Sequence, residues 1–255
     1  MNLFFNRLIK LSANGTKPFS YFFHYLFPKK RFTIPGKAAP LVRSRRETKI
    51  PKIIWQTNYT DKVTLPVYLN YLFNRLMAPT YEHRFMDTQG RLDFIRENFP
   101  DEIVRSYQKL NIGASQADMW RLLVLKAYGG VYMDIDAHLV WPLPFIIRPE
   151  YDELFMTTRA GHYTNYFLAS KKGNPRIDKI ISILLEHIHK ARHKSVYDMT
   201  GPPLVNMVVK GQDVPRRSYK LTCVQGSFTN EYFQYIDNPQ KKWTHARPED
   251  LLKSG

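Results

Sequence analysis

The sequence has 255 residues and a hydrophobic fraction of 44%, with 16 Tyr and 16 Phe. This length and composition exclude a wholly disordered chain and allow one large domain with a sizeable core. No period of about 20–50 residues repeats along the chain, which excludes a solenoid. The formal net charge is +16, and it is unevenly distributed.

Most of the positive charge lies at the start of the chain. Residues 1–50 carry eleven Lys or Arg and one acid, Glu47, so they supply +10 of the +16. Such asymmetry favours contact with an anionic surface, either membrane or nucleic acid. A solvated, partly disordered leader is the alternative. Because no zinc finger, RNP aromatic motif or basic helix-turn-helix is found, we expect no nucleic-acid partner.

The same segment has the pattern of an amphipathic, membrane-surface helix. On a helical wheel the first apolar residues gather on one side, whereas Asn6, Arg7 and Lys10 lie mostly on the other. An aromatic run at 21–27 is followed by basic residues at 29–31. No apolar stretch approaches the ~18 residues of a membrane span, and no clean signal peptide is present. We hypothesise that residues 1–49 form a basic extension that binds an anionic membrane surface.

Cys223 is the single cysteine, which excludes a disulfide within the chain and a thiolate zinc site. This usage fits a reducing cytosol. With no membrane anchor and no disulfides of the kind expected in a Golgi enzyme, we expect a bacterial, cytoplasmic protein. It would lie peripherally on the inner face of the cytoplasmic membrane.

The expected elements begin after a linker at 33–51 that is rich in Pro and charge. A short apolar run at 53–55 predicts a buried strand, and Pro66 opens a helix that extends to residue 77. A strand is expected at 83–87, followed by helices at 92–99 and 101–110 that Pro100 separates. The folded domain is therefore expected over residues 50–255.

Residues 115–136 form the most informative stretch. Ser115 is expected to start a helix with one apolar face, and Gly129 and Gly130 can end it through a positive φ. Residues 131–136 then alternate, so Tyr132, Asp134 and Asp136 point to one side of a strand.

Further strands are expected at 153–158, 163–170 and 221–224, with helices at 177–193 and from a turn at 200–203 through 207. Helices that alternate with short apolar strands predict an α/β domain around a mainly parallel sheet.

Asp134 and Asp136 are the strongest chemical signal. Two carboxylates at the end of an apolar strand can share a divalent cation and its diphosphate ligand. The alternative is an ordinary solvent-facing strand with two acids. Asp118 and Arg121 share a helix face three residues apart. A capping box from Ser115 to Asp118, and a surface salt bridge for Arg121, are the alternatives there.

These residues together resemble a known family. The pattern is Ala117-Asp118-Met119-Trp120-Arg121, then 122–128, then Gly129 to Asp136 and Pro142-Leu143, with 50–57 resembling a first strand. It is similar to the sugar-binding Asp-x-Asp glycosyltransferases over roughly residues 50–210. That family includes the outer-chain-initiating mannosyltransferase of yeast, bacterial capsule and lipopolysaccharide glycosyltransferases, and the donor-binding core of glucosylating clostridial toxins.

The resemblance implies a GT-A fold and a Mn²⁺- or Mg²⁺-dependent, retaining glycosyltransferase. It would use a nucleotide-diphosphate sugar donor and a cell-surface polysaccharide or lipopolysaccharide acceptor. Asp136 would bind the metal directly and Asp134 through water, while Arg121 would lie near the diphosphate. The implied donor-binding residues are Trp55, Gln56, Thr57, Asp118, Arg121, Asp134, Asn165, Thr200 and Gly201.

The C-terminal part of the pattern is less specific. Trp243 and His245 match late residues that close the site in relatives, and His245 is a candidate metal ligand. A packed aromatic and a surface histidine are the alternatives.

Three other functions share part of this pattern. A phosphatase of the haloacid dehalogenase type also uses Asp-x-Asp, but its motif has Thr or Val two positions after the second Asp, where this chain has His138. A catalytically inactive family relative and a basic membrane-binding protein remain as alternatives.

Overall fold

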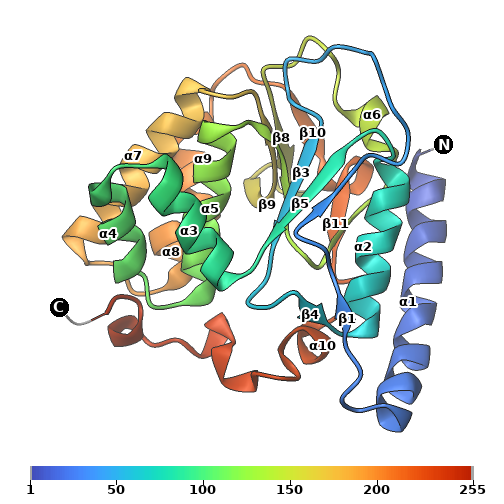
Figure 1. The fold of residues 1–255 in the computed structure, drawn as a ribbon. Coiled ribbons are helices and arrows are strands. Elements are labelled where there is room, and N and C mark those ends of the chain that lie inside the picture. Colours follow the sequence, from blue (N-terminus) through green and yellow to red (C-terminus); the bar gives the residue numbers. More distant parts are fainter. Residues whose placement is uncertain (1, 254–255) are drawn as a thin grey trace.

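A seven-stranded sheet lies at the centre of the computed structural model, which describes residues 2–253, apart from the side chains of residues 2, 3, 5 and 241 (Figure 1). Its strands, in spatial order, are β10 (Arg216–Ser218), β8 (Glu153–Thr157), β9 (Tyr163–Ser170), β6 (Gly130–Met133), β3 (Ile53–Thr57), β5 (Glu82–Met86) and β2 (Lys37–Ala38). Strand β3 pairs in parallel with β5 and β6, and β8 pairs in parallel with β10. Strand β9 is antiparallel to β6 and β8, and β2 is antiparallel to β5. Only β9 and β2 of this sheet therefore run against the other five strands, and the predicted α/β class with a mainly parallel sheet is confirmed.

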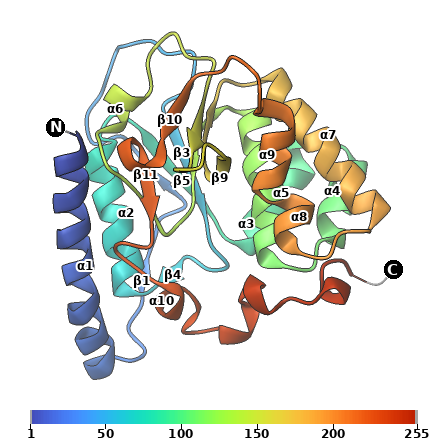
Figure 2. The same ribbon diagram turned by 180° about the vertical axis from the view of Figure 1, so that it is seen from behind.

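Helices cover both faces of the sheet (Figures 1 and 2). One face carries α3 (Thr88–Asn98), α4 (Asp101–Lys109), α5 (Gly113–Ala127), α7 (Pro175–Lys190), α8 (Val196–Thr200) and α9 (Pro202–Val209). The other face carries α2 (Leu65–Met77) and α6 (Leu143–Ile146), and α1 (Asn2–Leu26) lies outside α2.

Two short ribbons complete the strands. Strand β1 (Phe32–Thr33) pairs antiparallel with β4 (Lys62–Val63), and β7 (Ala137–Leu139) with β11 (Cys223–Gln225). After β11 the chain crosses below the sheet in the view of Figure 1. This C-terminal segment contains α10 (Glu231–Tyr235) and three short 3₁₀ helices, η2 (Pro239–Lys241), η3 (Trp243–His245) and η4 (Pro248–Asp250). A further 3₁₀ helix, η1 (Tyr219–Leu221), precedes β11.

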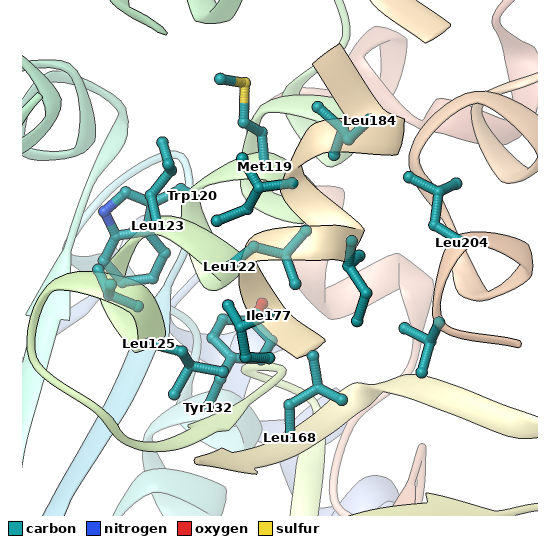
Figure 3. Packing of buried hydrophobic residues seen from close by; sticks show 14 of the residues in the cluster. Met119, Trp120, Leu122, Leu123, Leu125, Tyr132, Leu168, Ile177, Leu184 and Leu204 are labelled. Atoms are coloured by element: carbon teal, nitrogen blue, oxygen red, sulfur yellow. The ribbon is translucent and has the colours of Figure 1, made fainter. Parts of the chain in front are cut away.

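The main core fixes α5 against the sheet. Met119, Trp120 and Leu123 of α5 are fully buried and pack with Tyr132 and residues of α7 (Figure 3). Each such side chain contributes about 1.5–3 kcal/mol through removal of apolar surface from water. Because α5 leads directly into β6, this packing also fixes where β6 begins.

The expected helix-ending turn at Gly129 and Gly130 is present. Their φ angles are +70° and +109°, which favour glycine. A Cβ atom on Gly130 would lie 2.7 Å from the carbonyl oxygen of Ile53. Glycine therefore allows β6 to approach β3 closely at the centre of the sheet.

Two local predictions are wrong. Strand β6 ends at Met133, and Asp134 and Asp136 lie in the turn before β7. The amide of Ala137 donates to the carbonyl of Asp134 at 3.0 Å and closes this turn. Helix α5 begins at Gly113, two residues before Ser115, so Ser115 is inside the helix and no capping box joins it to Asp118.

Residues 2–49 pack against the rest of the chain. Helix α1 contacts α2 and η1, and β1 and β2 pair with strands from residues 62–63 and 82–86. The stretch expected to be a linker thus adds two short strands. In residues 2–253 no helix combines the length and the apolar character needed to span a membrane.

Candidate active site

The acidic pair sits on a turn whose backbone is held from two sides. Gln56 donates from Nε2 to the carbonyl of Asp134 at 3.2 Å. Asn70 of α2 donates to the carbonyl of Ile135 at 2.8 Å and to that of Ala137 at 3.0 Å. These side chains are buried, so the turn is fixed at the end of a central strand.

The two carboxylates converge on one point. The side-chain nitrogen of Gln225 lies 3.0 Å from Asp134 Oδ2 and 3.1 Å from Asp136 Oδ1. Burial, and then the charge of Asp134, raise the pKa of Asp136 to about 6, against hydrogen bonds from Gln225 and Gln234. Two oxygens that meet at one position, one of them on a carboxyl group that ionises reluctantly, fit a divalent cation.

Arg121 supplies positive charge beside this pair. Its Nη2 lies 2.8 Å from Asp118 Oδ1 and 3.3 Å from Asp134 Oδ1. The guanidinium also stacks 4.4 Å from the ring centre of Tyr132, whose hydroxyl donates to Asp134 Oδ1 at 2.6 Å. Arg121 is 5% exposed, so these charges interact with little screening by water.

Asp118 holds the guanidinium of Arg121 in place through an ion pair. Its carboxylate also accepts hydrogen bonds from Asn165 Nδ2 at 3.0 Å and Thr200 Oγ1 at 2.7 Å. Burial raises the pKa of Asp118 to about 6, although Arg121 and Thr200 oppose the shift. A Cβ on Gly201 would lie 2.6 Å from the carbonyl oxygen of Tyr197, so glycine is needed for the tight turn that presents Thr200.

A cavity of about 670 Å³ opens over the acidic pair. It is bounded by the ends of β3 and β6, the first half of α5, β11 and the C-terminal segment. Of the predicted site residues, the lining includes Thr57, Arg121, Asp134, Asp136, Trp243 and His245.

Trp55 and Gln56 are not among the residues that line this cavity, and their direct contact with a donor stays a prediction. The Trp55 ring is fully buried against Phe94 and Trp120, and its Nε1 donates to the carbonyl of Gly129. The Gln56 side chain lies on the opposite face of β3 and holds the Asp134 carbonyl. Both side chains therefore hold nearby backbone carbonyls in place.

Asp118, Asn165, Thr200 and Gly201 are likewise absent from the cavity lining. The first three join Arg121 in one hydrogen-bonded cluster, and Gly201 shapes the adjoining turn. Their direct contact with a donor stays a prediction.

His245 stays a prediction as a metal ligand. It lines the same cavity as the acidic pair. Across residues 2–253, however, no three His, Cys, Asp or Glu side chains cluster closely enough to hold a metal ion. The structure brings together the two carboxylates of Asp134 and Asp136.

Three further residues join the site. Gln225 contacts both carboxylates, Tyr132 contacts Asp134 and Arg121, and the buried Arg91 lines the cavity. Alternation in 131–136 had placed Tyr132 on the side of the two acids, which was the available signal. Gln225 lies about 90 residues from the pair, and no local pattern connects it to them.

An acidic pair lies beside a buried arginine at the mouth of a large cavity, and carboxylates and a guanidinium are groups that can hold a cation and a phosphate-bearing ligand. Residues 66–159 match the family described as "Glycosyltransferase sugar-binding region containing DXD motif". These residues are similar to the sugar-binding region of the DXD glycosyltransferases, and the resemblance read from the sequence is confirmed.

Individual relatives agree with this class. The chain is 35% identical over 185 residues to the initiation-specific alpha-1,6-mannosyltransferase of Schizosaccharomyces pombe, covering 60% of this chain and 46% of that protein. It is 32% identical over 89 residues to the uncharacterized glycosyltransferase L373 of Acanthamoeba polyphaga mimivirus, covering 34% and 36%. The chain spans less than half the length of these two relatives. The solved PaToxG glycosyltransferase matches with a TM-score of 0.47 and 18% identity, over 63% of this chain and 69% of that one.

Proposed function

We propose that this chain is a metal-dependent, retaining glycosyltransferase that moves a sugar from a nucleotide-diphosphate donor to a glycan or glycolipid. The convergence of Asp134 Oδ2 and Asp136 Oδ1 on a single position, beside Arg121 in a cavity of about 670 Å³, carries the proposal. The match of residues 66–159 to the DXD family supports the reaction class.

Asp134 and Asp136 would hold Mn²⁺ or Mg²⁺, with the remaining ligands from diphosphate and water. A bound cation supplies positive charge that stabilises the leaving diphosphate. For it to bind, Asp136 must be ionised and the amide of Gln225 must leave the position between the two carboxylates. The exposure of Gln225 at the end of β11 leaves its side chain free to turn.

Arg121 would contribute a fixed positive charge near the diphosphate. Its contacts with Asp118, the Asn165 carbonyl and the Tyr132 ring orient the guanidinium before any ligand binds. Preorganised charge of this kind stabilises a developing anion without reorganisation during the reaction.

Retention is proposed from the resemblance, with attack on the same face from which the diphosphate leaves. In the described lining of the cavity the acids are Asp134, Asp136 and Asp250, and Asp250 pairs with Arg247. The first two are assigned to the cation, which leaves no carboxylate placed as a nucleophile. A trapped covalent glycosyl-enzyme would contradict this part.

A panel of nucleotide sugars, assayed for Mn²⁺-dependent donor hydrolysis, tests the activity. Asp136→Asn should lower the rate at least about 100-fold because it removes a cation ligand. Asp93→Asn, a change at a half-exposed residue of α3 outside the cavity lining, is the matched control and should leave the rate unchanged. Full turnover by Asp136→Asn would remove the assignment.

The acceptor is proposed to be a cell-surface polysaccharide or lipopolysaccharide, reached from a membrane surface. Helix α1 supports this location because its apolar stripe faces outward. Asn6, Ala13, Ser20 and His24 face the protein and are at most 6% exposed. The outward stripe consists of Phe4, Leu8, Leu11, Phe19, Phe22, Tyr25 and Leu26, all between 44% and 82% exposed.

Charge complementarity favours an anionic bilayer as the partner of this stripe. Arg7, Lys29 and Lys30 flank it and are exposed, and apolar side chains beside basic ones are typical of segments that lie in an anionic membrane interface. This also supports the proposed location on the inner face of the cytoplasmic membrane.

Flotation with vesicles tests the membrane surface. The intact chain should bind vesicles that contain phosphatidylglycerol, and Leu11→Glu combined with Phe22→Glu should reduce binding at least about tenfold. Met207→Glu replaces an equally exposed residue of α9 and should have no effect. Equal binding by all three proteins, or a dimer that only the α1 changes dissociate, would contradict the membrane assignment.

A further inference from the structure

The inner face of α1 contacts the C-terminal segment that closes one side of the cavity. Lys17 Nζ donates to the carbonyl of Gly226 at 2.7 Å. One turn further along α1, Tyr21 Oη accepts a hydrogen bond from Asn230 Nδ2 at 2.9 Å. Gly226 directly follows Gln225, which contacts both carboxylates of the acidic pair. Helix α1 therefore follows the chain from its contact with the acidic pair to the start of α10.

Aromatic packing joins α1 to α10 itself. Phe233 of α10 is 1% exposed, and its ring centre lies 4.6 Å from that of Tyr21 and 5.8 Å from that of His24. The neighbouring ring of Tyr232 stacks on Tyr21 at 5.5 Å. Helix α1 thus supplies part of the apolar surface that removes Phe233 from water.

An ion pair holds the chain just after α10. Arg31 Nε donates to Asp237 Oδ2 at 2.7 Å, and Arg31 Nη2 donates to Asp237 Oδ1. The side chain of Arg31 is only 15% exposed. A guanidinium that binds both oxygens of one carboxylate fixes distance and orientation together. Arg31 therefore fixes the position of the chain at residue 237.

The residues between these anchors line the cavity. Gln234 and Tyr235 lie between Phe233 and Asp237, and both belong to the cavity lining. Trp243 follows in the same segment and also lines the cavity. The anchored side chains face α1 and its extension, whereas their neighbours in sequence face the space over the acidic pair. Contacts with residues 17–31 therefore set where this wall of the cavity stands.

The acidic pair itself is held by other elements. Gln56 of β3 and Asn70 of α2 fix the turn that carries it, and Arg121 belongs to α5. Loss of the α1 contacts should therefore displace the C-terminal wall and leave the cation ligands in place. Such a change removes contacts with a bound donor without removing the groups that act on its diphosphate.

We infer that Tyr21 and Arg31 are positioning residues that hold the C-terminal segment over a bound nucleotide sugar. The inference rests on the proposed function and goes further, because it makes residues 17–31 part of the transferase site. Helix α1 would then have two roles: its outward stripe faces the membrane surface, and its inner face supports the cavity wall.

Rates of donor hydrolysis in Mn²⁺, with UDP-glucose and GDP-mannose as probes, test the ion pair in the full chain. Arg31→Asp and Asp237→Arg should each raise KM at least about tenfold and change kcat less than about threefold, since lost uniform binding appears in KM. The double variant restores opposite charges and should return KM to within about threefold of wild type. Arg96→Gln breaks an exposed ion pair of α3 and should leave both constants unchanged.

Hydrogen exchange separates a displaced wall from general unfolding. Tyr21→Ala and Arg31→Asp should each speed amide exchange in residues 226–246 at least about tenfold, because this segment loses an anchor. Exchange in β3 and α5 should stay as in wild type. Loss of folded protein would instead speed exchange in every element, and it would lower the apparent kcat without changing KM.

Unchanged KM in the Arg31 and Asp237 single variants, no restoration in the double variant, or unchanged exchange in residues 226–246 would overturn the inference and leave the transferase proposal standing. Failure of wild type to hydrolyse any nucleotide sugar would instead overturn the proposed function, and the exchange measurement would still decide whether α1 holds the C-terminal segment.

Discussion

Single side chains at this site act mainly by holding other side chains. Gln56 fixes a carbonyl, Asp118 fixes Arg121, and Thr200 fixes Asp118. From the sequence, Asp118, Arg121, Asp134, Asn165 and Thr200 were all predicted to belong to one site, and the structure brings them together. Their arrangement, in which Arg121 lines the cavity and Asp118 contacts Arg121 without lining the cavity, depends on tertiary contacts that no local spacing encodes.

Thr200→Val should destabilise the fold by about 1–2 kcal/mol and raise the pKa of Asp118 further. The hydroxyl donates to the buried carboxylate, and its loss leaves an acceptor without compensation. Thr164→Val is the matched control because the Thr164 hydroxyl is buried without a partner, so the change should be neutral or slightly stabilising. Urea unfolding measures both, and equal losses would contradict the assigned hydrogen bond.

The helices and strands that were predicted best are those whose apolar residues recur in a regular pattern along the whole element. Helices α2, α5 and α7 and strands β3, β8 and β9 lie within a few residues of their expected positions. The end of β6 was missed because the turn at 134–137 is stabilised by Gln56 and Asn70, which are distant in sequence. Strands β1 and β2 are two residues long, so no periodicity marks them.

The junction of α5 and β6 supports a prediction about glycine. Gly130→Ala should cost at least about 2–3 kcal/mol, because φ is +109° and the added Cβ would lie 2.7 Å from the backbone of β3. Gly173→Ala also has a positive φ, of +65°, but nothing lies within 4 Å of its Cβ, so it should cost about 1 kcal/mol. Equal losses in unfolding free energy would show that close strand approach does not matter here.

At the scale of the whole molecule, a buried histidine in the central sheet makes the free energy of unfolding depend on pH. His83 of β5 is 1% exposed, and its Nε2 bonds to Gln56 Oε1 at 2.7 Å. Its Nδ1 is buried without a partner. Burial first, and then the charge of Arg75, lower the pKa of His83 to about 3.

The pKa of His83 in the folded chain lies below its unfolded value of 6.5. Between these two pH values the unfolded chain therefore binds a proton at His83 that the folded chain does not bind. Stability should therefore fall as pH drops from 6.5 toward 3, by up to about 1.4 kcal/mol per pH unit from this group. His83→Gln keeps a donor for Gln56 but does not titrate, so its unfolding free energy should fall less steeply over that range. Parallel curves for the two proteins between pH 7 and 4.5 would contradict the assignment.

The most direct test of the central claim is a crystal of the full chain soaked with MnCl₂ and UDP, measured at a wavelength where manganese scatters anomalously. The account predicts an anomalous peak between Asp134 and Asp136, with the side chain of Gln225 displaced and the diphosphate in contact with the ion. Ordered UDP in the cavity without manganese at the two carboxylates would contradict it.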